Sequence, residues 1–140
     1  MSKKIQSKRD FSMLNKGLAQ YQKLNTQSAV EGASPHRLIQ MLMEGVLQRL
    51  SEAKGAMLRH EVSVKAEALG KGISIIGGLR DSLNKEVGGD IANNLDELYD
   101  YMQRRLLEAN VQNNSDYVDE VMALMRTIKS GWDDIAEEVV

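Results

Sequence analysis

The sequence contains no cysteine, which excludes disulfide bonds, zinc sites built on thiolates and catalysis by a cysteine nucleophile. Proline occurs once, at Pro35, so no later residue forces a helix to break. Aromatic residues make up only 4% of the chain, which is too few for the core of a β-sandwich or barrel. The 140 residues suffice for one domain, and we expect that domain to be all-α.

An excess of charge of one sign and a long apolar run are also missing. The chain has 18 Lys and Arg residues against 20 Asp and Glu residues, so overall charge gives no reason to expect nucleic acid as a partner. No run of about 18 apolar residues occurs, which excludes a membrane-spanning helix. The basic N-terminus has no apolar stretch behind it and does not look like a secretory signal. We therefore expect a cytoplasmic protein without membrane insertion.

Apolar residues at helical spacing predict four long helices. Ser34 followed by Pro35 is a strong start signal for the first. Gly88-Gly89 is expected to break the chain, and Asp90 is expected to cap the third helix. Asn113-Asn114-Ser115-Asp116 is expected to form a turn with a cap before the fourth helix. The apolar seam of the second helix begins at Val62, and that of the third begins at Ile91. The helices are expected over residues 35–59, 62–85, 91–109 and 117–139. Because short turns join helices of similar length, we expect an antiparallel up-down-up-down four-helix bundle over residues 34–140.

The residues before the bundle differ from it in pattern. Residues 1–12 are polar and basic without a helical period, and we expect a disordered tail. Residues 13–33 are expected to form an N-terminal cap segment and a linker. Leu14, Leu18 and Tyr21 fall on one face of this segment, but three turns of helix are marginal alone. We therefore predict a short, movable helical segment that leans on the bundle.

Residues that could carry catalysis or bind a metal are not grouped. His36 and His60 lie near opposite ends of the first expected helix, on the order of 36 Å apart at 1.5 Å per residue. They cannot share a metal ion within one chain. The Glu-x-x-His pairs of di-iron bundles are also missing from the sequence. We expect no catalytic residue, no metal and no cofactor.

The second expected helix carries glycine at four internal positions, each costing about 1 kcal/mol relative to alanine, so something should compensate for them. These positions are Gly70, Gly72, Gly77 and Gly78.

This helix also has a second apolar stripe, roughly 100–120° from its main seam. The stripe consists of Val64, Ala68, Gly72, Ile75 and Leu79. Small residues between larger ones would form a groove that another helix can enter. Equally, a bundle helix touches two neighbours, so the stripe could be ordinary core. Tyr101, Leu107 and Val111 fall outside the main seam of the third helix in the same way.

An ordered set of short segments resembles the FliS family of flagellar secretion chaperones over roughly residues 18–136. The segments are Tyr21-Gln22 with Thr26, the run Ala33-Ser34-Pro35-His36-Arg37-Leu38-Ile39-Gln40-Met41-Leu42, Ile75-Ile76-Gly77-Gly78-Leu79, Gly88-Gly89, Leu98-Tyr99-Asp100-Tyr101, Ala109-Asn110 and Trp132. No single segment is diagnostic, but their order and spacing are specific.

The resemblance implies a cytoplasmic export chaperone without enzymatic activity. Such a protein binds the C-terminal segment of flagellin, prevents its premature polymerisation and delivers it to the flagellar type III export gate. Leu14, Leu18 and Tyr21 match a movable cap that also meets an export gate component. The client-binding groove would use Val64, Ala68, Gly72, Ile75, Leu79 and Tyr101. The alternative from the residues alone is a homodimeric structural or regulatory bundle that uses the same stripe to dimerise.

Overall fold

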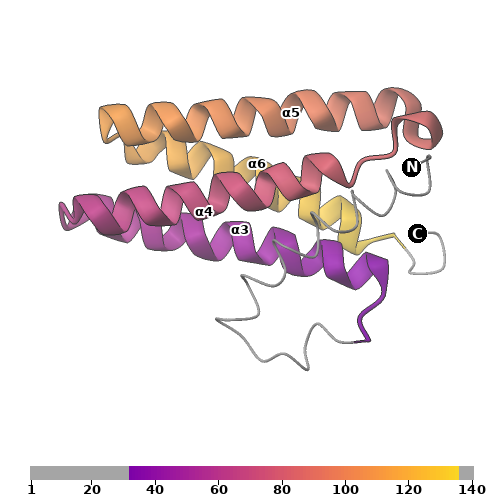
Figure 1. Cartoon of the computed structure of the whole chain (residues 1–140), viewed down its shortest axis with the longest axis horizontal. Coiled ribbons are helices and arrows are strands. Elements are labelled where there is room, and N and C mark those ends of the chain that lie inside the picture. Colours follow the sequence, from indigo (N-terminus) through magenta and orange to yellow (C-terminus); the bar gives the residue numbers. More distant parts are fainter. Residues whose placement is uncertain (1–31, 136–140) are drawn as a thin grey trace, which may run out of the picture.

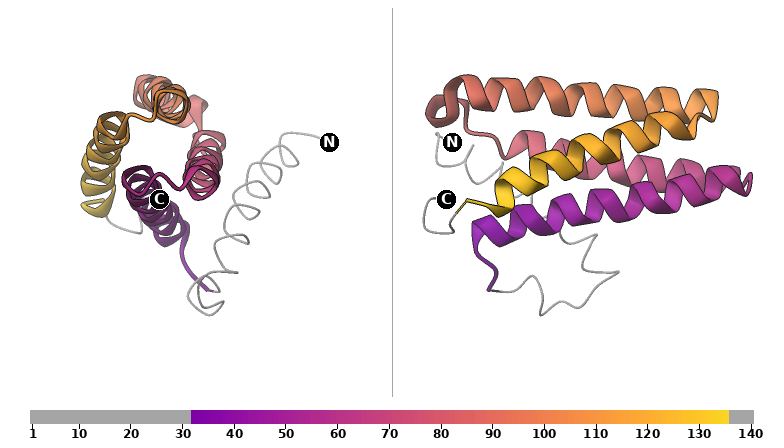
Figure 2. Two further views of the ribbon diagram at one scale, coloured as in Figure 1. Left: turned by 90° about the vertical axis from the view of Figure 1, so that its left-hand side faces the viewer. Right: turned by 180° about the vertical axis from the view of Figure 1, so that it is seen from behind.

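The structure, a computed structural model, describes residues 32–135, and these form a bundle of four helices (Figure 1). The helices are α3 (Pro35–Leu58), α4 (Val62–Asp81), α5 (Lys85–Gln112) and α6 (Ser115–Asp133). α3 packs against α4 and α6, and α5 packs against the same two helices. An end-on view shows the four helices around one core (Figure 2). The prediction of an all-α four-helix bundle is confirmed, while the predictions for the tail and cap segment fall on residues 1–31, outside the described part.

Side-chain caps set the helix starts. Ser34 has an extended backbone and its hydroxyl oxygen accepts a hydrogen bond from the Arg37 amide at 3.1 Å, while Pro35 occupies the first helical turn. At the turn between α5 and α6, Asn113 is left-handed with φ 51°, and the Asn114 side chain accepts from the Asp116 amide. The capping residues at these two helix starts can therefore be recognised in the sequence.

The core consists of apolar side chains from all four helices, and several are fully buried. Leu42, Val46 and Leu50 come from α3, and Leu69 and Ile76 come from α4. α5 and α6 contribute the fully buried side chains Met102, Leu106, Val118 and Met125. Each such burial stabilises the fold by roughly 1.5–3 kcal/mol relative to exposure. The apolar seams are therefore the main stabilising feature of the bundle.

The turn between α4 and α5 differs from the prediction. α4 ends at Asp81, and the Asn84 side chain caps a helix that already begins at Lys85. Gly89, with φ 53° and ψ −126°, breaks the helical path inside α5, a conformation that glycine adopts without steric cost. The predicted start of the third helix at Asp90 was therefore wrong.

Two residues predicted to start core seams are instead exposed. Val62 is 68% exposed and Ile91 is 72% exposed. Val62 is the first residue of α4, and Ile91 follows the break at Gly89 inside α5.

Candidate functional site

Most of the predicted second stripe of α4 is buried in the core, and Gly72 packs against α3. Ala68, Ile75 and Leu79 are at most 7% exposed, and Gly72 is also buried. A Cβ atom placed on Gly72 would lie 3.1 Å from Leu50 Cδ2 of α3. The small residue does allow a helix to approach closely, but that helix is the chain's own α3. The prediction of an open groove at Gly72, Ile75 and Leu79 was therefore wrong, because these side chains are sealed within the bundle.

Val64 is the member of the stripe that remains accessible, with 48% of its surface exposed. It stands in the first turn of α4, one helical turn before Ala68. A single exposed valine is not a binding surface by itself. Leu14, Leu18 and Tyr21, predicted as the cap, lie outside the described residues.

Tyr101 is half-buried between α5 and α6, and its hydroxyl donates a hydrogen bond to Glu120 Oε2 at 2.5 Å. Arg105 Nε donates to the other oxygen of the same carboxylate at 2.8 Å, and the guanidinium lies over the Tyr117 ring. The bond to Glu120 raises the pKa of Tyr101, and the two donors lower the pKa of Glu120. The structure thus places Tyr101 away from the α4 stripe, with its hydroxyl engaged, its ring half-buried and the Arg104 guanidinium 6.0 Å from the ring centroid.

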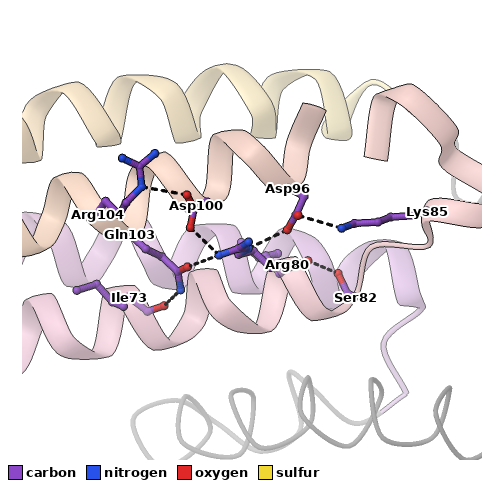
Figure 3. Close-up of polar contacts among 9 residues, drawn as sticks. Ile73, Arg80, Ser82, Lys85, Asp96, Asp100, Gln103 and Arg104 are labelled. Atoms are coloured by element: carbon purple, nitrogen blue, oxygen red, sulfur yellow. Dashed lines mark hydrogen bonds and ion pairs between the residues drawn. The ribbon is translucent and has the colours of Figure 1, made fainter. Parts of the chain in front are cut away.

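A ladder of polar contacts fixes how α4 and α5 are aligned (Figure 3). Arg80 binds Asp96 at 2.8 Å and Asp100 at 3.1 Å, and also donates to Gln103 at 3.0 Å. Gln103 Nε2 donates to the Ile73 carbonyl at 3.0 Å. Near the other end, Lys65 Nζ donates to the Asn110 carbonyl at 3.1 Å.

The Arg80 end of this ladder borders a polar pocket of about 420 Å³. Hydrogen bonds from Arg80 and Lys85 lower the pKa of the Asp96 carboxyl, so this carboxylate stays charged and paired at neutral pH. Within the pocket lining, Arg80 and Lys85 both pair with Asp96, and the ion pair between Arg80 and Asp96 joins α4 to α5.

This alignment brings a different apolar surface together. Leu107 follows Gln103 by four residues and precedes Asn110 by three, so it lies on the side of α5 next to α4. Because the antiparallel helices advance by the same rise per residue, Gly70 lies level with Leu107, and Ala66 lies level with Val111.

The members of this surface are accessible. Leu107 is 56% exposed and Val111 is 85% exposed. Ala66 and Gly70 are also exposed, and a Cβ at Gly70 would meet nothing within 4 Å. From the alignment above, we infer that these residues and Val62 lie together toward one end of the two helices, and we name this set the α4–α5 patch. The sequence marks Leu107 and Val111 as off the main seam but does not show which α4 residues lie beside them.

Within residues 32–135, no three His, Asp or Glu side chains come together as metal ligands. Among the helices that the structure describes, none is both long enough and apolar enough to cross a membrane.

Comparison with known proteins gives one consistent result. The family described as "Flagellar protein FliS" matches residues 17–139. The chain is 51% identical over 121 residues to "Flagellar secretion chaperone FliSB" of Pseudomonas aeruginosa, covering 86% of this chain and 96% of that protein. It is 46% identical over 121 residues to "Flagellar secretion chaperone FliS" of Vibrio cholerae, covering 86% and 89%. It is 31% identical over 106 residues to the protein of that name from Bacillus subtilis, covering 76% and 78%.

Proposed function

This chain belongs to the FliS family of flagellar secretion chaperones, which are not enzymes, and from that premise we propose that its client is flagellin. It binds the C-terminal segment of flagellin in the bacterial cytoplasm and prevents premature polymerisation. It then delivers the client to a component of the flagellar type III export gate. The observation that carries this proposal is the family match over residues 17–139.

We place client binding on the α4–α5 patch. An amphipathic helix binds a partner by laying apolar side chains at i, i+3 or i+4, and i+7 onto an apolar surface. Leu107 and Val111 supply exposed branched side chains at that spacing, and Gly70 and Ala66 leave room beside them. Client side chains that are buried here are no longer available to other flagellin subunits, so binding prevents polymerisation by competition.

The residues predicted from the sequence take secondary parts in this proposal. Val64 extends the contact around the start of α4, and the half-buried Tyr101 provides a separate contact between α5 and α6. Ala68, Gly72, Ile75 and Leu79 are buried in the core, so they meet a client only if the helices of the bundle separate, which would cost their apolar burial. Leu14, Leu18 and Tyr21 remain the proposed cap and export gate contact.

Two valines of α5 make a matched test, because Val87 and Val111 are each 85% exposed but stand at opposite ends of the helix. A synthetic flagellin C-terminal peptide is titrated into the full chain by isothermal calorimetry. Val111→Glu or Leu107→Glu is expected to weaken binding by about tenfold or more, since a charge must then be desolvated at an apolar contact. Val87→Glu is expected to leave the affinity unchanged.

Absence of binding by the unaltered chain would contradict the flagellin proposal itself. Equal weakening by Val87→Glu and Val111→Glu would contradict only the placement on the patch. Substituting Ile75 by a charged residue is not a useful test, because Ile75 is 7% exposed and the variant would destabilise the core. Sedimentation at several concentrations addresses the dimer alternative, which predicts a tight dimer unaffected by the peptide.

A further inference from the structure

The last turn of α6 is joined to the first turn of α3 by a reciprocal pair of hydrogen bonds. Trp132 Nε1 donates to the His36 carbonyl at 3.0 Å, and His36 Nε2 donates to the Trp132 carbonyl at 2.8 Å. A carbonyl can only accept, so the proton of this second bond is on Nε2. The two rings are stacked, with centroids 5.0 Å apart and planes 13° apart. Each residue therefore holds the backbone of the other.

Polar side chains on both sides of this pair add further links between the two helices. Gln40 Nε2 of α3 donates to Asp133 Oδ1 at 2.8 Å. Lys129 of α6 pairs with Asp133 at 2.8 Å and with Glu44 of α3 at 3.8 Å. Since surface ion pairs contribute little by themselves, the stacked pair is the main attachment of this turn.

Apolar packing does little to hold the end of α6. Met125 is the last buried apolar side chain of this helix, and after it only Ile128 and Trp132 are partly buried. Gly131 is exposed, and a Cβ placed on it would meet nothing within 4 Å. No close packing therefore calls for glycine here, and its effect is to weaken the helical turn.

We propose that residues 129–135 form a detachable strap, which is closed on α3 by the pair His36 and Trp132 and opens without unfolding of the bundle. The strap is the last turn of α6 with the two residues after it, and it holds the first turn of α3. Opening therefore frees about two turns of chain at the end of α6 and releases the start of α3 at the same time. A partner that binds one end of the chain changes the restraint on the other end.

The strap is independent of the α4–α5 patch. The end of α6, which carries Trp132, lies at the end of the bundle where α3 begins, whereas the end of α5, which carries Val111, lies at the opposite end; the helix ends can be followed in Figure 1. Its behaviour is measured in the free chain without flagellin, so neither outcome affects the proposed function.

The test uses hydrogen exchange of the full chain, followed by mass spectrometry of peptides covering the strap. His36→Ala is expected to speed exchange in 129–135 by about tenfold or more while the core of α5 stays unchanged, because only the local opening becomes easier. Lys54→Ala removes an ion pair with Asp119 between the same two helices and is the control expected to leave the strap unaltered. His36→Gln retains an N–H donor and is expected to restore part of the protection.

Gly131→Ala provides a variant that cannot fail by unfolding. It strengthens the strap helix and is expected to slow strap exchange by about fivefold. Trp132 is the single tryptophan of the sequence, so quenching of its fluorescence by acrylamide reports the same opening and should rise in His36→Ala. Unchanged strap exchange in His36→Ala, or equal acceleration in all four helices, would overturn the proposal. Failure of Gly131→Ala to slow strap exchange would do the same.

Discussion

The glycines of α4 offer a test of how closely α3 and α4 approach each other. Gly72 and Gly78 both lie inside the helix, but their surroundings differ. A Cβ on Gly72 would lie 3.1 Å from Leu50 Cδ2, and Leu50 is fully buried, whereas a Cβ on Gly78 would meet nothing within 4 Å. Alanine at either position gains the helix propensity that glycine lacks, about 1 kcal/mol. Only at Gly72 must a core side chain also move.

We expect Gly78→Ala to raise the free energy of unfolding by about 1 kcal/mol. Overpacking of a core costs roughly 1–3 kcal/mol, so Gly72→Ala is expected to be neutral or to lower the same free energy by up to about 2 kcal/mol. Equilibrium unfolding in urea measures both. With a slope of about 1–3 kcal/mol per molar, the two midpoints should differ by roughly 0.3 M or more.

A double-mutant cycle with Leu50 assigns the cause. Leu50→Ala removes the atoms that the new methyl group would meet, so Gly72→Ala should become stabilising, like Gly78→Ala, in that background. If Gly72→Ala raises stability as much as Gly78→Ala in the unaltered chain, the close approach of α3 to α4 is refuted. The conclusion that the Gly72 stripe is sealed would then be refuted as well.

Two further predictions concern single side chains. Burial raises the pKa of Tyr99 to about 12. The folded state therefore keeps the phenol neutral more strongly than the unfolded state does, and this stabilisation is complete below about pH 10. It is lost as the pH rises toward 12, and the loss in the free energy of unfolding is up to about 2–3 kcal/mol. Urea unfolding between pH 9 and 11 should show this loss, and Tyr99→Phe should remove most of it. If the free energy of unfolding of Tyr99→Phe falls with pH as steeply as that of the unaltered chain, the loss belongs to other groups. His60 lies two residues after the end of α3, in the left-handed region with φ 58°, where a Cβ costs roughly 1–2 kcal/mol. His60→Gly should therefore raise the urea midpoint, and a fall would show that the side chain has contacts that outweigh the strain.

The sequence by itself determined the helices and the family. Ser34-Pro35 and Asn113-Asn114 are local signals, because a cap acts on backbone groups within three residues of itself. The same locality explains the error between α4 and α5. Gly88-Gly89 predicts a break correctly, but Asn84 caps one turn of helix before it, and that turn lies outside any long apolar pattern.

Only the tertiary structure decided which apolar surface is open. Helical periodicity gives the direction in which a side chain leaves the axis of its own helix. By this measure, the stripe with Gly72 and the side of α5 with Leu107 are both apolar positions outside the main seam of their helix. One is covered by Leu50 of α3, and the other is covered by nothing that the structure describes. Whether a stripe becomes core or surface depends on where the neighbouring helices pack, and those contacts join residues far apart in the chain. The contact between His36 and Trp132 is of the same kind, since neither residue has a local pattern that points to the other.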